Sequence, residues 1–255
     1  MISIYSSAFN LIQNNFDYIS TINNFCSIAD EVIICVNTSQ DNTLEALKQI
    51  SYNNLKIITS EISYDDPLLD GKIKNHALQN TSEKHPIKIG LDMDEYIPLW
   101  QKDIWLYLAN QLINDSCSCY MIPSINLYKD SDHYFSITPK WYMHKSGLFR
   151  GPVNFARKAD GHIDTTKSDT CELIDVDGNL VISKMTPYDI NVLRNNRLPF
   201  VVHTGYVSLN NRLLRNKNFW SKHWLTESGG TPPAHKIHEK IEDFDHAANP
   251  HYLKI

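Results

Sequence analysis

Residues 87–98 read IKIGLDMDEYIP, an apolar run that leads directly into three carboxylates within four positions. The run over 87–92 predicts a buried β-strand. Asp92, Asp94 and Glu95 would repel one another at the end of such a strand unless a cation neutralised them. Asp92 and Asp94 point to the same side of an extended backbone, so they can offer oxygen ligands to Mg²⁺ or Mn²⁺ beside a phosphate. The alternative is a turn whose acids are merely solvated.

Strands and helices alternate ahead of this segment. The predicted strands are 2–6, 31–37 and 55–62, and the predicted helices are 11–26, one that begins at Asn42, and 71–83. The strands are apolar throughout rather than alternating, which is typical of a parallel sheet covered by helices on both faces. The sequence therefore predicts an α/β fold, a Rossmann-like and mostly parallel central sheet flanked by helices. Its ligands should lie at the carboxyl ends of the strands.

The pattern becomes irregular after Pro98. A helix is expected over 101–114, β-like runs over 117–129, 134–143, 180–184 and 199–204, and a last helix over 210–225. No repeat or low-complexity linker separates the two parts. We therefore expect residues 1–100 to form a ligand-binding half and residues 101–255 a more irregular α+β half of the same compact body.

Composition excludes several classes of protein. The 255 residues carry a net charge of −5, which argues against nucleic acid or anionic lipid as the main ligand. Five cysteines without the regular spacing of a disulfide scaffold favour a reducing compartment. No basic segment follows Met1, and no apolar run reaches the roughly 18 residues of a membrane span. We expect a cytoplasmic protein with no membrane span and no nucleic-acid partner.

Four fragments carry a resemblance to a known family. They are IYSSAFN at the first strand, VNTSQDNT after the second, KIKNHAL ahead of the fourth, and DMDE at 92–95. In this order and spacing the sequence resembles the family-two glycosyltransferases of the GT-A fold, whose D-x-D motif often reads DADE. VNTSQDNT is similar to the family's second-strand loop, which ends S-x-D-x-T, and KIKNHAL to the segment that precedes the D-x-D strand.

The resemblance implies a nucleotide-sugar site in the first half. Asp41 would approach the base, Asp92 the ribose or sugar, and Asp94 would ligate the metal that bridges the diphosphate. Ser6 in the first loop and Asn75 in KIKNHAL would also belong to the nucleotide-sugar site.

One further segment resembles the DADE-type subgroup. LPFVVHTGYVSLNNRLLRNKNFW is similar to a C-terminal segment that returns to the active site. The resemblance makes His203 a candidate metal ligand or diphosphate contact, and Arg212 and Arg215 candidate phosphate contacts. A buried structural histidine is the alternative for His203.

The implied function is a metal-dependent glycosyltransferase of the hexosyltransferase type, using Mn²⁺ or Mg²⁺. It would move a sugar, with inversion, from a nucleotide-sugar donor, a UDP-sugar being favoured, to a carbohydrate or lipid-linked acceptor in surface polysaccharide or glycan synthesis. Inversion requires a base for the acceptor hydroxyl. Glu172 is the first candidate and Asp169 and Asp175 are alternatives, although this segment also fits a solvated turn.

Two other functions would use a similar sheet. A nucleotidylyltransferase would carry a Gly-rich, basic phosphate loop after the first strand, and SSAFN has none. A catalytically silent GT-A-like nucleotide-binding or scaffold domain would keep the fold and lack the base. This silent domain is the alternative function.

Overall fold

The computed structural model describes residues 1–63, 66, 69–146, 149–157, 163–164, 170–175, 183–185, 189–215 and 251–252. The helices are α1 (Tyr18–Ile28), α2 (Thr43–Lys48), α3 (Leu69–Gln79), α4 (Lys102–Asn114), α5 (Ile190–Asn195) and α6 (Leu209–Arg215), with a 3-10 turn η1 (Leu99–Gln101). The strands are β1 (Ile2–Ala8), β2 (Glu31–Asn37), β3 (Leu55–Ser60), β4 (Ile87–Gly90), β5 (Glu95–Tyr96), β6 (Cys119–Leu127), β7 (His133–Lys145), β8 (Phe149–Arg157), β9 (Ile163–Asp164), β10 (Thr170–Asp175), β11 (Ser183–Met185), β12 (Val201–His203) and β13 (His251–Tyr252). Within this part of the chain, no helix combines the length and apolar character needed to cross a membrane.

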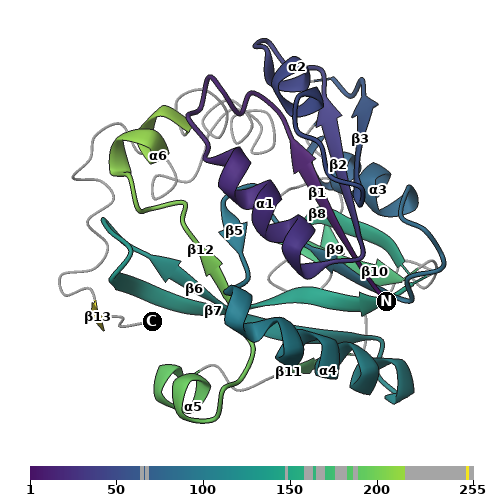
Figure 1. The fold of residues 1–255 in the computed structure, drawn as a ribbon, viewed down its shortest axis with the longest axis vertical. Helices are drawn as coiled ribbons and strands as arrows, with labels where there is room; N and C mark the ends of the chain where they lie inside the picture. The colour runs from purple at the N-terminus through teal and green to yellow at the C-terminus, as the bar shows by residue number, and fades with distance from the viewer. Residues whose placement is uncertain are drawn as a thin grey trace.

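The first half is a parallel sheet in the order β3-β2-β1-β4. Successive side chains of each strand point to opposite faces, and both faces are buried. Ile4 and Ile34 pack with α1 and α4 on one face, whereas Tyr5 and Ile33 pack with α3 on the other. Figure 1 shows α1 in front of these strands and α3 behind them. Burial on both faces explains why these strands are apolar throughout.

The second half extends the same sheet. β7 pairs antiparallel with β4, β6 with β7, β12 parallel with β6, and β5 antiparallel with β12. The order is therefore β3-β2-β1-β4-β7-β6-β12-β5, with β11 on β6 and β13 on β7. A separate three-stranded sheet, β10-β8-β9, lies against α3 through β8.

These observations confirm the predicted fold class, a mixed α/β fold with a mostly parallel central sheet flanked by helices. The predicted helix over 11–26 was wrong at its start, because α1 begins at Tyr18. Residues 11–15 form turns instead, with positive φ at Asn10 (48°) and Asn15 (51°), and Asp17 caps the helix through the Ser20 amide. The sheet β10-β8-β9 and helix α5 were not predicted. Of the helix expected over 210–225, residues 216–225 lie outside the described residues.

A buried polar pair joins the two halves where β4 meets β7. The Tyr5 hydroxyl lies 3.0 Å from Nε2 of His144, and both residues are buried. A Cβ at Gly90 would lie 2.7 Å from the Tyr5 hydroxyl oxygen, so this position requires glycine. Burial lowers the pKa of His144, a hydrogen bond to the Lys145 carbonyl acts to raise it and the charge of Lys88 acts to lower it, and together these bring the pKa to about 4.

This burial predicts a pH dependence of stability. The folded-state pKa of His144 lies below the 6.5 of an exposed histidine, so the unfolded chain binds more protons between pH 6.5 and 4. The free energy of unfolding should therefore fall as the pH falls through this window, by up to about 3 kcal/mol from His144. Urea denaturation of the protein and of His144→Gln between pH 4 and 7.5 measures this difference. Equal pH slopes for the two proteins would contradict the prediction.

Candidate functional site

The acidic segment forms a tight turn between β4 and β5. The Glu95 amide donates to the Asp92 carbonyl, and the Asp92 amide donates to the Glu95 carboxylate, each at 3.0 Å. Thr204 donates to the Asp94 carbonyl through both its amide and its hydroxyl, at 2.8 and 2.9 Å. Thr21 donates to the Met93 carbonyl at 3.1 Å. These bonds fix the turn from three sides and leave the Asp92 and Asp94 side chains to face the site.

Glu95 faces away from the other two acids. Its carboxylate is 1% exposed, and Oε1 accepts from the Lys140 ammonium and the Tyr142 hydroxyl, each at 2.6 Å. Burial and the charge of Glu95 raise the pKa of Tyr142 well above its ordinary value. Glu95 is therefore a structural acid that holds the turn, and the repulsion that remains is between Asp92 and Asp94, where the charge of Asp94 acts to raise the pKa of Asp92.

Asp92 is balanced by lysines. Lys74 of α3 lies 2.6 Å from the Asp92 carboxylate and 3.0 Å from Asp70, which accepts a bond from the Ser7 hydroxyl at 3.1 Å. Burial acts to raise the pKa of Asp92, but the charges of Lys74 and Lys140 outweigh it and the pKa is lowered. The Asp92 side chain remains 37% exposed, so it can contact a ligand.

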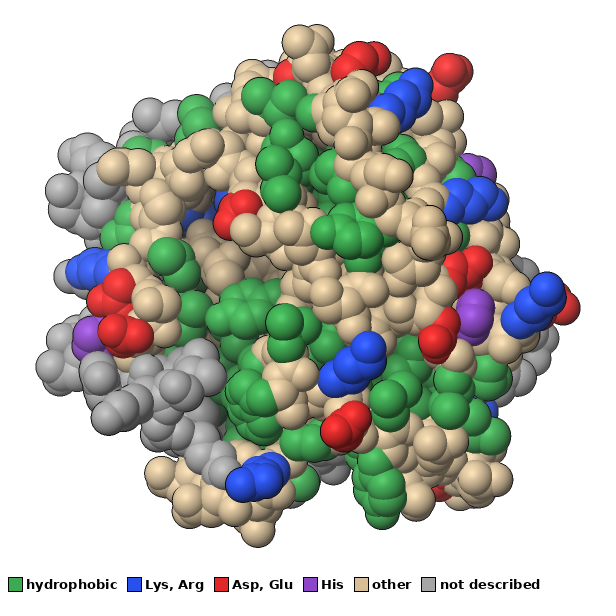
Figure 2. All heavy atoms as spheres, in the orientation of Figure 1, with side chains coloured by type: hydrophobic (Ala, Val, Ile, Leu, Met, Phe, Trp, Pro, Cys, Tyr) green, Lys and Arg blue, Asp and Glu red, His purple; other side chains and the backbone are tan. Residues whose placement is uncertain are grey.

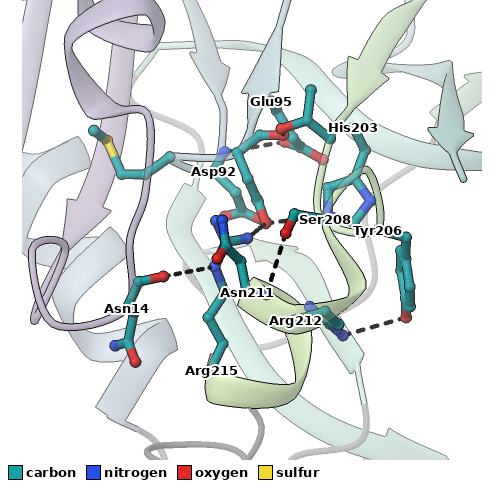
Figure 3. A network of polar contacts seen from close by, with 12 residues as sticks. Asn14, Asp92, Glu95, His203, Tyr206, Ser208, Asn211, Arg212 and Arg215 are labelled. Carbon is teal, nitrogen blue, oxygen red and sulfur yellow. Dashed lines mark hydrogen bonds and ion pairs between the residues drawn. The ribbon is translucent and has the colours of Figure 1, made fainter. Parts of the chain in front are cut away.

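Asp94 lies deeper and has different partners. Its Oδ2 lies 3.4 Å from Nε2 of His203 and 3.1 Å from Nη1 of Arg215. Burial acts to raise the pKa of Asp94, but His203 and Arg215 outweigh it and hold the pKa well below its ordinary value. Figure 3 shows Arg215 between the acidic turn and Asn14, whose carbonyl accepts from Nε at 3.3 Å. The guanidinium also stacks on Phe16, 3.6 Å from the ring centroid.

His203 owes its position to the strand register. β12 lies between β6 and β5, which places His203 opposite both Asn126 and Glu95. Nδ1 of His203 donates to the Asn126 amide oxygen at 2.8 Å, and this bond orients the ring with Nε2 toward Asp94. Because Asn126 engages Nδ1, Nε2 is the nitrogen that this ring would offer to a metal ion, the arrangement found in metal-binding histidines.

These side chains surround a cavity of about 250 Å³. The lining residues are Ser7, Phe9, Leu11, Asn14, Phe16, Asp70, Lys74, Asp92, Met93, Asp94, Lys140, His203, Arg212 and Arg215. They come from the end of β1 and the loop after it, from α3, the acidic turn, β7, β12 and α6. Figure 2 shows this face hollowed between α6 and α1, with basic and acidic side chains at the hollow. The cavity therefore lies where the carboxyl ends of β1 and β4 were predicted to gather ligands.

The structure thus brings together five of the predicted residues, Asp92, Asp94, His203, Arg212 and Arg215, around one cavity. Ser6 is fully buried inside β1, whereas its neighbour Ser7 lines the cavity. Asp41 does not line the cavity, and its two oxygens accept from the amides of Gln13 and Thr43. Asp41 therefore fixes the loop after β1, and its contact with a base stays a prediction.

Asn75 is not among the residues that line the cavity, and the structure does not describe the side chain of Glu172. Asn75 follows Lys74 on α3, and its amide oxygen is buried with no hydrogen-bond partner among the described residues. Glu172 belongs to β10, opposite Val153 of β8, the strand that contacts α3. Its side chain and the whole of Asp169 lie outside the described residues, so the predicted base is untested.

Sequence reasoning missed Lys74, Lys140 and Asp70. Lys74 stands inside KIKNHAL, next to Asn75, and an excess of carboxylates at a buried strand end requires nearby cations. That requirement was a signal for Lys74. Lys140 gave no local signal, because only the antiparallel pairing of β7 in the sheet brings it to the acidic turn.

The donor atoms of Asp94 and His203 fit a divalent cation whose remaining coordination positions are filled by a bound ligand. In the described part of the chain no group of three or more His, Cys, Asp or Glu residues could hold a metal by itself. Asp94 and His203 supply one carboxylate and one imidazole nitrogen close together. Mg²⁺ is characteristically held by one or two carboxylates together with substrate phosphates. Nε of Arg212 is also buried without an acceptor in the described structure, so the cavity wall holds a donor available to an anion.

No family model matches this sequence, and no curated protein matches it. Similar solved structures include residues 1–349 of S. aureus TarS with UDP, at 16% identity, covering 86% of this chain and 54% of that chain, with a TM-score of 0.41. The mannosyltransferase PcManGT from Pyrobaculum calidifontis, with GDP-Man and Mn²⁺, is 12% identical over 95% of this chain and 68% of that chain, with a TM-score of 0.47.

This chain resembles those two structures at TM-scores that carry no argument about its activity. It spans only about half of the TarS fragment. A third similar structure is 4-diphosphocytidyl-2C-methyl-D-erythritol synthase from Anaerococcus prevotii, at 10% identity, covering 57% of this chain and 70% of that chain, with a TM-score of 0.34. These likenesses concern the fold, so the chemistry must be argued from the site itself.

The role of Glu95 can be tested through stability. Glu95→Gln places an amide NH₂ where two donors now meet the carboxylate, which leaves buried donors unpaired. The free energy of unfolding should fall by about 1–3 kcal/mol in urea denaturation. Glu45→Gln, on the exposed face of α2, is the matched control and should change it by less than about 0.5 kcal/mol. A Glu95→Gln protein as stable as the control would contradict the structural role.

Proposed function

We propose that this protein is a divalent-metal-dependent glycosyltransferase that moves a sugar from a nucleotide-sugar donor to an acceptor hydroxyl. The proposal rests on the convergence of Asp94, His203, Arg212 and Arg215 on one cavity that Asp92 and Lys74 also line. A nucleoside diphosphate needs cations for its phosphates, and a sugar needs hydrogen-bonding groups beside them. The cavity holds both.

The charges around the cavity support this ligand. Lys74, Lys140, Arg212 and Arg215 supply four positive charges, and Asp70, Asp92, Asp94 and Glu95 supply four negative ones. A divalent cation adds two positive charges and a nucleotide-sugar diphosphate adds two negative charges. Each alone would unbalance a site of low dielectric constant, whereas together they leave it neutral. Metal and donor should therefore bind cooperatively.

The lining residues suggest a division of roles. Asp94 and His203 would hold Mn²⁺ or Mg²⁺, which when bound stabilises the negative charge of the departing diphosphate. Arg212 and Arg215 would donate to phosphate oxygens. Asp92 and Lys74 would contact hydroxyls of the ribose or the transferred sugar. Phe9 and Leu11 give the cavity an apolar wall beside the loop that Asp41 fixes.

The acceptor side belongs to the second half of the chain in this proposal. Residues 101–255 would bind a carbohydrate or lipid-linked acceptor, as in surface polysaccharide or glycan synthesis. Transfer with inversion would use Glu172 to take the proton from the acceptor hydroxyl. A UDP-sugar is the favoured donor. The placement of β10 in the sheet that contacts α3, the helix of Lys74, supports a search for the base in this strand.

The metal role of Asp94 is tested by nucleotide binding. We expect Mn²⁺ to strengthen binding of UDP to the protein, measured by calorimetry with Mn²⁺ and with chelator. Asp94→Asn should remove this strengthening and keep or increase metal-free binding, because Arg215 loses its carboxylate partner. Asp103→Asn, on the exposed face of α4, is the control and should behave like the parent protein. Undiminished metal enhancement in Asp94→Asn would remove the assignment.

A catalytically silent nucleotide-binding or scaffold domain is the second candidate. Asp70, Asp92 and Asp94, the carboxylates that line the described cavity, are all paired with cations, so none stands ready as a base. Glu172→Gln distinguishes the candidates. If Glu172 is the base, transfer from UDP-, GDP- or dTDP-sugars should slow by about 10²–10⁴-fold while donor affinity stays unchanged.

The control for this substitution is Glu61→Gln, which is exposed after β3. Normal turnover in Glu172→Gln would move the assignment to Asp169 or Asp175. Binding of nucleotide-sugars by the parent protein without any release of nucleotide, across varied acceptors, would favour the silent domain.

A further inference from the structure

Gly205 lies directly against the pair of predicted metal ligands. It is buried in the turn that leads from β12 to α6. A Cβ added at this position would lie 2.6 Å from Nε2 of His203, 2.7 Å from its Cε1 and 3.0 Å from Oδ2 of Asp94. The absent side chain of Gly205 therefore lets the imidazole of His203 and the carboxylate of Asp94 pack directly against the backbone of residue 205.

The backbone does not explain the glycine. The φ angle of Gly205 lies outside the left-handed region, so an alanine could adopt this conformation without backbone strain. The side chains of His203 and Asp94, which a methyl group would meet, are also held in place. Thr204 is bound to the Asp94 carbonyl by two hydrogen bonds, and the His203 ring is held by Asn126. The steric conflict at Gly205 thus falls on the imidazole and the carboxylate themselves.

We propose that Gly205 is a positioning residue: because it carries no side chain, His203 and Asp94 can lie side by side in the arrangement that a shared divalent metal ion requires. This inference rests on the proposed metal-dependent function. An ion bound at about 2.0–2.2 Å from an imidazole nitrogen and a carboxylate oxygen needs unfilled space beside both atoms. A methyl group at residue 205 would turn the ring out of line with Asp94.

The ligand class follows from the donors and the room. One carboxylate oxygen and one imidazole nitrogen suit Mn²⁺ and similar first-row ions, and the cavity leaves the remaining positions to phosphate oxygens and water. Nη1 of Arg215 lies 3.1 Å from Oδ2 of Asp94. An ion bound to Asp94 and the Arg215 guanidinium would therefore contact the same oxygen atom. Displacement of the imidazole by a methyl group at residue 205 would therefore leave the guanidinium as the main partner of Asp94.

The test is Mn²⁺ binding to Gly205→Ala, followed by electron paramagnetic resonance with and without UDP. Loss of one well-placed supporting group around a metal typically weakens binding by about 10–100-fold, and we expect a loss of this size. The nitrogen coupling of the His203 imidazole to Mn²⁺ should disappear from the spectrum, a change that general destabilisation would not produce. Asn210→Ala, exposed at the start of α6, is the control and should keep both affinity and coupling.

The outcomes separate this inference from the function on which it rests. Unchanged Mn²⁺ affinity and nitrogen coupling in Gly205→Ala would overturn the role of Gly205 and leave the metal site standing. Absence of Mn²⁺ binding in the parent protein, even with UDP, would overturn the metal site and the inference together. If Gly205→Ala does not fold, His203→Ala combined with Gly205→Ala should restore folding, because the ring that the methyl group meets is gone. Failure of this rescue would also overturn the inference.

Discussion

Charge compensation at the acidic turn is the constraint around which this structure is organised. Three carboxylates within four residues stand at a buried strand end, and each is paired separately. Asp92 meets Lys74 from α3, Asp94 meets His203 and Arg215 from the C-terminal segment, and Glu95 meets Lys140 from β7. A buried carboxylate without such a partner would be strongly unfavourable. The second half of the chain therefore completes the electrostatics of the first.

The same pairings assemble the cavity wall. Arg215 joins α6 to the loop after β1 through Asn14 and Phe16, and it reaches the acidic turn through Asp94. Asn15 adds a second link to α6 by donating to Asn211 at 3.1 Å. Residues some two hundred positions apart in the chain thus lie together around one ligand-sized space.

The local sequence pattern predicted most of the helices and strands in the first half of the chain and few of those in the second half. Strands 31–37 and 87–90 were predictable because burial on both faces requires apolar residues throughout. The start of α1 was not, because the positive φ angles of Asn10 and Asn15 turn an apolar, helix-like pattern into a loop. At the site, the resemblance anticipated that Asp94 and His203 would be neighbours. It could not reveal Lys140, whose place depends on strand pairing across the sheet.

The strand order has a geometric consequence for the site. In a flat sheet β4 and β5 would stand four strand spacings apart, about 19 Å, whereas residues 91–94 can span about 17 Å even when fully extended. The chain is folded into a turn there, so the sheet must curl until its edge approaches β4. Residues 91–94 then connect β4 to β5 directly across the open side of the curled sheet. The degree of curling sets the distance between Asp94 and His203. β6 has a register shift between Asn126 and Leu127, and Asn126 is the residue that orients His203. A change in sheet curvature at this shift would therefore also move the His203 ring.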